Sequence, residues 1–423
     1  MSVQVPKGYK QTEVGVIPED WLCGFTADVV KSMKAGLSRR LQERDIGIPV
    51  LISGNIENDR LSVDNLKYWY LNDPQGAKVE NYILKEGDIL LCFINSLAQI
   101  GKPCIFQDIG RPAIYTTNLF RIIINENATY KFAFYLFSSR HFQEKIQLIA
   151  KIAVNQASFT KPDFLKLAIP IPPVNEQHAI AEALSDADAL IESLEQLIAK
   201  KRQIKQGAMQ ELMTGQRRLP GFSGEWKNFL WGDLLISCSS GATPFRGNPE
   251  YYKGNINWVS SGELNYNVIY ETIEHVSTDA INKTNLKIHP PGTFLMAITG
   301  LEAAGTRGSC AILGVESATN QSCMAIYPGP NLSPGFLYNY YVFKGDELAF
   351  KYCQGTKQQS YTANIVKLLP IFIPPSLEEQ KAISSVFEEM DDEIKLLVEK
   401  LEKARQIKQA MMQELLTGRI RLI

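Results

Sequence analysis

Residues 373–380 read Ile-Pro-Pro-Ser-Leu-Glu-Glu-Gln, and they lead through Arg-Gln-Ile-Lys-Gln (405–409) to Met-Gln-Glu-Leu-Leu-Thr-Gly (412–418). Half a chain earlier the same pattern occurs as Ile-Pro-Pro-Val-Asn-Glu-Gln (171–177), Arg-Gln-Ile-Lys-Gln (202–206) and Met-Gln-Glu-Leu-Met-Thr-Gly (209–215). The shift is 202 residues at the prolines and 203 residues after one insertion. A repeat of this length predicts an internally duplicated architecture.

Each copy carries the marks of one long helix. Proline cannot occupy a helix interior, so the proline pairs end the preceding segments. Ser376 with Glu379 predicts a capping box, and Asn175 is the predicted N-cap of the first copy. Gly215 and Gly418 supply the left-handed residue that ends a helix. The roughly 40 residues between these marks predict helices of about 60 Å each.

Apolar residues in each copy are spaced alternately by four and three positions between charged flanks. This heptad spacing is typical of a coiled coil, so we expect the two helices to pair antiparallel as a rigid spacer. Two unrelated amphipathic helices are the alternative, which the shared residues disfavour. The spacing breaks after Ile198 and Ala404, where local winding should change. The predicted seam consists of Ile180, Leu184, Ala187, Ile191, Leu194 and Ile198 with Ile383, Phe387, Met390, Ile394, Leu397 and Leu401.

The remaining sequence predicts two globular domains, at residues 1–160 and 217–360, each followed by a long helix at 171–216 and 373–423. Short apolar runs at residues 48–52, 88–94 and 120–124 predict strands, and residues 131–151 read as helical. Residues 257–264 and 292–298 match 49–56 and 87–93 in position. The predicted fold class is therefore α+β, with two mixed α/β domains, an antiparallel helix pair and an internal pseudo-two-fold repeat.

Composition excludes several classes of protein. The chain of 423 residues has a net charge of −1, no apolar opening segment and no stretch apolar enough to span a bilayer. Its odd number of cysteines forms no Cys-x-x-Cys pair, which fits a reducing cytoplasm. The seven cysteines are Cys23, Cys92, Cys104, Cys238, Cys310, Cys323 and Cys353.

The contrast between near-identical helices and divergent domains is the functional clue. Two nearly identical surfaces should contact two copies of one partner, whereas two divergent surfaces on one scaffold should contact two different things. A spacer between them suits the reading of a split DNA sequence, because protein geometry then sets the half-site spacing.

The arrangement resembles the specificity subunit of type I restriction–modification enzymes. The residues that carry this resemblance are Thr12–Trp21 (Thr-Glu-Val-Gly-Val-Ile-Pro-Glu-Asp-Trp), the Ile-Pro-Pro…Glu-Gln helix starts and the Met-Gln-Glu-Leu…Thr-Gly helix ends. The resemblance implies two target recognition domains, each reading half of a bipartite site in double-stranded DNA. It also implies helices that space the domains and recruit two modification (methyltransferase) subunits, with restriction (translocase and nuclease) subunits joining that core. S-adenosylmethionine, ATP and Mg would belong to those partners, so this chain would hold no cofactor and no catalytic residue.

The sequence carries no complete catalytic or metal-binding motif. The closest approach to a methyltransferase motif is Asn248-Pro249-Glu250-Tyr251, which reads as a β-turn. No phosphate-binding Gly-x-x-x-x-Gly-Lys-Ser/Thr loop occurs, and Glu393-Ile394-Lys395 lies on the predicted coiled coil as solvated charge. The four histidines (His141, His178, His275 and His289) have no ligand partners at metal spacing, so no metal site is expected.

Side chains for reading DNA are expected in polar loops, because Arg, Lys, Asn, Gln, Ser and Thr recognise base edges and phosphates. Some of these residues will instead cap turns. The candidates in the first domain are Lys34, Arg39, Arg40, Ser53, Asn55, Lys102, Asn118, Asn155 and Gln156. The candidates in the second domain are Thr243, Arg246, Ser260, Ser261, Arg307, Asn320, Gln321, Lys357, Gln358 and Gln359.

Charge argues against a strong DNA binder acting alone. Residues 1–160 are only about two units positive and residues 221–360 about two units negative. We therefore expect the isolated chain to bind DNA weakly and partner subunits to neutralise many phosphates. The alternative function is a coiled-coil protein-interaction scaffold without DNA specificity.

Overall fold

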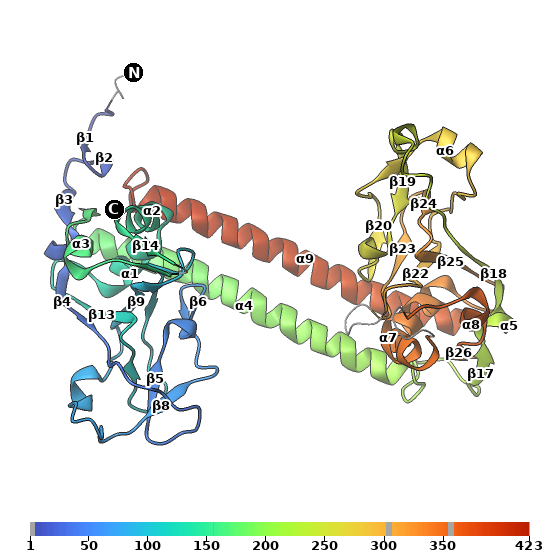
Figure 1. Ribbon diagram of the computed structural model, residues 1–423, viewed down its shortest axis with the longest axis horizontal. Coiled ribbons are helices and arrows are strands. Elements are labelled where there is room, and N and C mark those ends of the chain that lie inside the picture. The colour runs from blue at the N-terminus through green and yellow to red at the C-terminus, as the bar shows by residue number, and fades with distance from the viewer. Residues whose placement is uncertain (1–4, 155, 302–306, 354–358, 423) are drawn as a thin grey trace. The chain divides into compact units, whose positions relative to one another are not determined.

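The computed structural model of the protein describes residues 5–154, 156–301, 307–353 and 359–422 (Figure 1). The chain divides into two compact units, Met1–Glu195 with Glu399–Ile423, and Gln196–Val398. Each unit contains one globular domain and a segment of each of the two long helices (Figure 1).

The two long helices have equal length. α4 (Val174–Leu212) and α9 (Leu377–Leu415) each contain 39 residues, inside the predicted ranges 171–216 and 373–423. Gly215 and Gly418 both have φ of +69°, which confirms the predicted left-handed ends. Ser376 Oγ accepts the predicted capping hydrogen bond from Glu379 N at 3.1 Å.

One detail of the helix starts was predicted wrongly. α4 begins at Val174, so Asn175 lies inside its first turn and is not the N-cap. The reason is that Pro173 O accepts from both Glu176 N and Gln177 N at 3.0 Å and so starts the helix. At α9, Arg218 binds both oxygens of the Glu379 carboxylate.

Within each unit the helix segments run antiparallel, because the α9 residue number falls as the α4 number rises along the contact. The ion pairs that show this are Asp188–Lys408 and Glu195–Arg405 in the first unit, and Lys201–Glu393 and Lys205–Asp391 in the second. All the predicted seam residues are buried or half-buried. Ile180, Leu184, Ile383 and Phe387 also belong to the cores of the globular domains, so the helix starts are not coiled coil alone.

The first domain is built on an antiparallel sheet of order β11-β9-β13-β4, beside a three-stranded sheet of order β12-β5-β8 in which β12 and β5 are parallel. Their bounds are β4 (Val30–Ala35), β5 (Ile48–Leu51), β8 (Lys67–Trp69), β9 (Ile89–Cys92), β11 (Pro103–Ile105), β12 (Ile114–Tyr115) and β13 (Leu119–Ile124), which confirms the predicted strands. The expected helical segment is two helices, α1 (Tyr130–Ser138) and α2 (Arg140–Ile149), because Ser139 is extended and caps α2.

The other elements of the first unit connect and close this core. They are β1 (Tyr9–Thr12), β2 (Gly15–Pro18), β3 (Leu22–Phe25), β6 (Ile56–Glu57), β7 (Arg60–Leu61), β10 (Ile94–Asn95), β14 (Lys151–Ala153), β15 (Gln156–Ser158), α3 (Lys161–Leu165) and β16 (Ala168–Ile171). β16 pairs with β3, so the strand before α4 ties the end of the domain to its beginning.

The second domain repeats this plan with an extra edge strand. Its main sheet has the order β18-β25-β22-β23-β20, and its smaller sheet has the order β21-β19-β24 with β19 and β24 parallel. The bounds are β18 (Leu235–Ser240), β19 (Ile256–Val259), β20 (Asn267–Ile269), β21 (His275–Val276), β22 (Phe294–Ala297), β23 (Cys310–Leu313), β24 (Ser317–Thr319) and β25 (Cys323–Pro328). The remaining elements are β17 (Lys227–Leu230), α5 (Trp231–Leu234), α6 (Thr278–Lys283), α7 (Pro334–Tyr352), α8 (Ala363–Lys367) and β26 (Pro370–Ile373), which pairs with β17.

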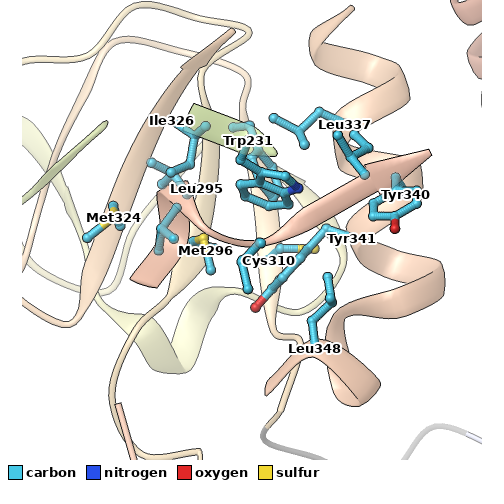
Figure 2. Packing of buried hydrophobic residues seen from close by; sticks show 14 of the residues in the cluster. Trp231, Leu295, Met296, Cys310, Met324, Ile326, Leu337, Tyr340, Tyr341 and Leu348 are labelled. Atoms are coloured by element: carbon cyan, nitrogen blue, oxygen red, sulfur yellow. The ribbon is translucent and has the colours of Figure 1, made fainter. Parts of the chain in front are cut away.

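The core of the second domain lies between its main sheet and α7. Trp231 is fully buried among Leu295, Ile326 and Leu337 (Figure 2). Its ring meets that of Tyr341 edge-on, with centroids 5.8 Å apart. Apolar burial of this extent stabilises a rigid scaffold, which lets the loops at the sheet edge diverge.

The repeated Glu-Gln pair at each helix start has a structural role. Gln177 Oε1 accepts from Thr129 N at 2.9 Å, and Gln380 Oε1 accepts from Ser333 N at 2.8 Å, so each glutamine holds the residue that precedes α1 or α7. The fully buried carboxylates of Glu176 and Glu379 bind arginines that follow the end of the opposite long helix. The motif therefore joins helix start, helix end and domain within each unit.

Candidate functional site

A close backbone crossing lies at one edge of the first domain. Gly36 N donates to Leu119 O at 3.3 Å, and Leu37 N donates to Tyr115 O at 2.9 Å. The chain that leaves β4 therefore lies against the turn between β12 and β13. A Cβ atom at Gly36 would lie 2.1 Å from Tyr115 O, so this approach requires glycine.

The second domain has the same crossing. Gly241 N donates to Cys323 O and Ala242 N donates to Thr319 O, both at 3.1 Å. A Cβ atom at Gly241 would lie 2.0 Å from Thr319 O. Gly36 and Gly241 are called the crossing glycines below, and each leads directly into a loop of predicted contact residues.

Two further loops meet each crossing. Thr116 N donates to Leu51 O at 3.0 Å, and Asn320 N donates to Val259 O at 2.9 Å, so the residues after β5 and β19 lie beside the turn. Next to it, Phe93 N donates to Asn118 O at 3.1 Å, and Ile298 N donates to Ser322 O at 2.9 Å. The structure thus gathers loops that are far apart in sequence at equivalent edges of the two domains.

The predicted contact residues of the first domain fall into three groups. Lys34, Arg40 and Gln156 are exposed, whereas Ser53, Lys102 and Asn118 are half-buried. Arg39 is half-buried in an ion pair with Asp73. Asn55 is 2% exposed, accepts from Ile52 N and donates to Asp64 O, so its amide holds a turn and burial argues against the predicted base contact. Asn155 lies outside the described residues.

The predicted residues of the second domain that the structure describes are all exposed or half-buried. Thr243, Arg246 and Gln321 are exposed, and Ser260, Ser261, Arg307, Asn320 and Gln359 are half-buried. The Thr243 hydroxyl donates to Gln321 Oε1 and so links two loops of the edge. Ser260 Oγ donates to Glu263 Oε2 at 2.7 Å, and Asn320 Oδ1 accepts from Ser322 N at 2.9 Å, which are turn-holding roles. Lys357 and Gln358 lie outside the described residues.

One exposed residue at the edge was missed by the sequence prediction. Phe245, four positions after the crossing glycine Gly241, is 75% exposed. The prediction selected polar residue types, and that rule passes over an aromatic side chain. The available signal was its place in a loop rich in Gly and Pro, where a large apolar residue has no core to enter.

The long helices offer a second candidate surface. The repeated Arg-Gln-Ile-Lys-Gln segments, Arg202–Gln206 and Arg405–Gln409, are called the helix motifs, and one lies in each unit. Their isoleucines, Ile204 and Ile407, are 47% and 50% exposed, although both helices continue unbroken there. The two isoleucines occupy the same place in the repeated motifs, so each unit presents the same exposed apolar residue.

In the first unit the helix motif borders a groove of about 1790 Å³. Lys408 and Gln409 line it together with Met412 and Gln413 of α9. Arg60 of the β6–β7 hairpin lines another part of the wall, and its guanidinium binds Glu195 at 3.1 Å. The groove is large enough to accept side chains of a second protein.

The described parts of the chain contain no group of three or more His, Cys, Asp or Glu side chains arranged to hold a metal ion. Within the same residues, no helix has the length and apolar content needed to cross a bilayer.

Comparisons with known proteins agree with one another. Residues 18–204 and 223–406 each match the family model for the type I restriction modification DNA specificity domain. The chain is 28% identical to the putative type I restriction enzyme MjaX specificity subunit of Methanocaldococcus jannaschii, over 98% of this chain and 97% of that one. It is 23% identical to the MjaVIII specificity subunit of the same organism, over 96% and 94% of the two chains.

Solved structures share the fold. The S subunit of a type I restriction–modification system from M. genitalium superposes with a TM-score of 0.61 at 14% identity and 98% coverage of both chains. A chain from a study of assembly and conformational transition of the type I system gives a TM-score of 0.54 at 15% identity, covering 96% of this chain and 99% of that one.

Proposed function

Because the chain belongs to the specificity-subunit family of type I restriction–modification enzymes, we propose that each globular domain reads one half of a bipartite target in double-stranded DNA. The observation that carries this proposal is the pair of equivalent domain edges. Both edges are built on a crossing glycine and the same backbone hydrogen bonds, yet they expose different side chains. Two domains that share a backbone arrangement but expose different side chains fit the reading of two different half-sites.

The helix motifs, in this proposal, bind two identical modification (methyltransferase) subunits. Support comes from their repetition, since each unit has one motif with an isoleucine about half exposed. In the first unit the groove beside α9 would receive part of one such subunit. Restriction subunits would join the assembled core, and the two paired helices would set the gap between the half-sites.

We assign the chemistry to the partners. S-adenosylmethionine would bind the modification subunits, and ATP with Mg would bind the restriction subunits, while this chain would contribute recognition without a catalytic residue. The complex would act in the cytoplasm, where host DNA is modified.

The test is reconstitution with a modification (methyltransferase) subunit from the same organism. We expect DNA methylation at one bipartite sequence only when both chains are present, as measured by sequencing the methylated bases. Methylation by the modification subunit alone, or a complex that methylates no defined sequence, would contradict the proposal. If the complex assembles but methylates no defined sequence, the result favours the alternative function, a protein-interaction scaffold without DNA specificity.

A further inference from the structure

The loop after each crossing glycine contains one arginine that is committed to the scaffold. In the first domain this is Arg39, whose Nε donates to both carboxylate oxygens of Asp73 at 3.1 and 3.2 Å. Asp73 also accepts from Trp69 Nε1 at 3.1 Å and from Ala77 N at 2.9 Å, and its side chain is completely buried. Such a network fixes the backbone of the loop and removes Arg39 from the set of free donors.

In the second domain the committed residue is Arg246. Its guanidinium binds both oxygens of Glu274, at 2.5 and 2.8 Å. The same group lies 4.4 Å from the ring centroid of Tyr252 and 5.1 Å from that of Trp258. A planar cation paired on its edge and stacked on its face is held in one orientation. Arg246, selected from the sequence as a DNA contact, thus also supports the loop, and its side chain remains 55% exposed.

The fourth residue after each crossing glycine has an exposed side chain and is adjacent in sequence to the ion-paired arginine. It is Arg40 in the first domain and Phe245 in the second. The Arg40 side chain makes no hydrogen bond or ion pair with the residues that the structure describes. Phe245 is held by its backbone, because its carbonyl accepts from Asn248 N at 3.0 Å and the preceding Pro244 O accepts from Tyr252 OH at 2.6 Å.

The ring of Phe245 has a defined position although it is exposed. It packs over Gly247, where an added Cβ atom would lie 2.5 Å from Cε1 of the ring. The Phe245 side chain is 75% exposed on a loop whose backbone is held by hydrogen bonds, so it presents an apolar surface that a ligand can contact. Bases in DNA offer such a surface, in the thymine methyl group or in the face of an unstacked step.

We propose that the fourth residue after the crossing glycine is the base-reading side chain of each domain, with Arg40 contacting a guanine and Phe245 contacting a thymine methyl group. This inference rests on the proposed function, and it names the side chain with which each domain recognises a base of its own half-site. Arg40 has two parallel donors that match O6 and N7 of guanine in the major groove. Phe245 can form no hydrogen bond with a base edge, so its discrimination must come from apolar contact.

The test uses the full chain assembled with its modification subunit and reads the methylated sequence. The variants are Arg40→Ala and Arg40→Lys in the first domain, and Phe245→Ala and Phe245→Leu in the second. Arg44→Ala removes the same charge nearby, and Ile236→Ala removes an exposed apolar side chain from the other end of β18; both serve as controls. Thermal unfolding of each variant confirms that the domains remain folded.

We expect each variant to relax one base pair in its own half-site and to leave the other half unchanged. For Arg40→Ala the preference for guanine should fall about 5- to 150-fold, and Arg40→Lys should restore it only in part. For Phe245→Ala the preference for thymine should fall about 4-fold, the value of one lost methyl contact, and Phe245→Leu should keep most of it. The control variants should retain the parental sequence.

Uracil substitution isolates the methyl contact. Replacing the affected thymine by uracil should slow methylation by the parental complex about 4-fold and leave the Phe245→Ala complex unaffected. Variants that methylate the parental sequence with unchanged preference, or that both alter one half-site, would overturn the inference while leaving the proposed function intact. A parental complex that methylates no bipartite sequence would instead defeat the proposed function itself.

Discussion

Arg421 Nε lies 2.6 Å from Glu176 Oε1, which joins the chain after the end of α9 to the first turn of α4 within the first unit. Arg421 Nη2 donates to Glu176 Oε2 at 2.8 Å, and Trp21 Nε1 donates to the same oxygen at 2.8 Å. The Glu176 side chain is fully buried, whereas that of Arg421 is 21% exposed. The equivalent pair in the second unit, Arg218 with Glu379, has the same burial of its carboxylate.

Arg421→Ala should destabilise the first unit by about 3 kcal/mol, because it leaves the buried Glu176 carboxylate without its cationic partner. Urea unfolding followed by tryptophan fluorescence measures the change. The matched control is Arg419→Ala, whose partner Glu414 is 3.4 Å away and whose side chain is 59% exposed, so its loss should cost under about 1 kcal/mol. Equal effects of the two substitutions would show that the buried pair does not hold the unit together.

Asp73 gives a pH dependence with a defined sign. The neighbouring Arg39 guanidinium holds the pKa of the Asp73 carboxyl well below its ordinary value of 3.8. A carboxyl whose folded-state pKa is lowered contributes stability above the unfolded-state pKa, and that contribution is lost as the pH falls through and below 3.8. The parental chain should therefore be more stable than Asp73→Asn at pH 7, and the difference should shrink below pH 4.

Urea unfolding of both chains at several pH values between 7 and 3 measures this difference. Asp279→Asn, which removes a carboxylate paired with Lys283 on the exposed surface of α6, is the control and should cost little stability at pH 7. A constant gap between the parental chain and Asp73→Asn across the range would mean that this carboxyl is not held ionised by Arg39.

The helix motifs predict the stoichiometry of the complex. Ile204→Asp and Ile407→Asp should each remove one modification subunit, and the double variant should remove both, because a charge replaces an apolar contact at the interface. Native mass spectrometry of the purified complexes measures the subunit count. Ala199→Asp, exposed on α4 outside the motif, should keep both subunits, and retention of both by the double variant would exclude the motifs as docking sites.

Sequence reasoning found the features whose signal is local or repeated. Helix ends such as Gly418 are visible because proline, glycine and heptad spacing act over a few residues. The partner of Glu176 was not foreseeable, since Arg421 is 245 residues away and only the fold brings them together. Asn55 was selected as a DNA contact for its polarity, but a polar side chain in a turn can equally satisfy the backbone, and here it does.

For a related reason, the sequence could not distinguish the arginines held in ion pairs from the side chains proposed to contact bases. Arg39 and Arg40 are adjacent and identical in type, and only the buried position of Asp73 distinguishes the one from the other. Phe245 was overlooked because its exposure depends on a loop held by Glu274 and Tyr252, which the sequence does not place beside it. Which loop residues are free is a property of the packed edge, whereas the location of the loops follows from the strand pattern.

The crossing glycine gives the sharpest test that geometry at the domain edge controls recognition. Gly241→Ala would place a Cβ atom 2.0 Å from Thr319 O, so the chain after β18 must move away from the turn before β25. Thr243 would then separate from Gln321, although the core around Trp231 lies elsewhere in the domain. We expect methylation directed by the second half-site to fall at least 10-fold, a loss of about 1.4 kcal/mol in discrimination or rate.

Gly262→Ala, where an added Cβ meets no atom within 4 Å, should keep parental activity, and the first half-site should stay unchanged in both variants. If Gly241→Ala methylates at the parental rate and sequence, the crossing has no part in positioning the loop, and the edge of the domain must be held by other contacts.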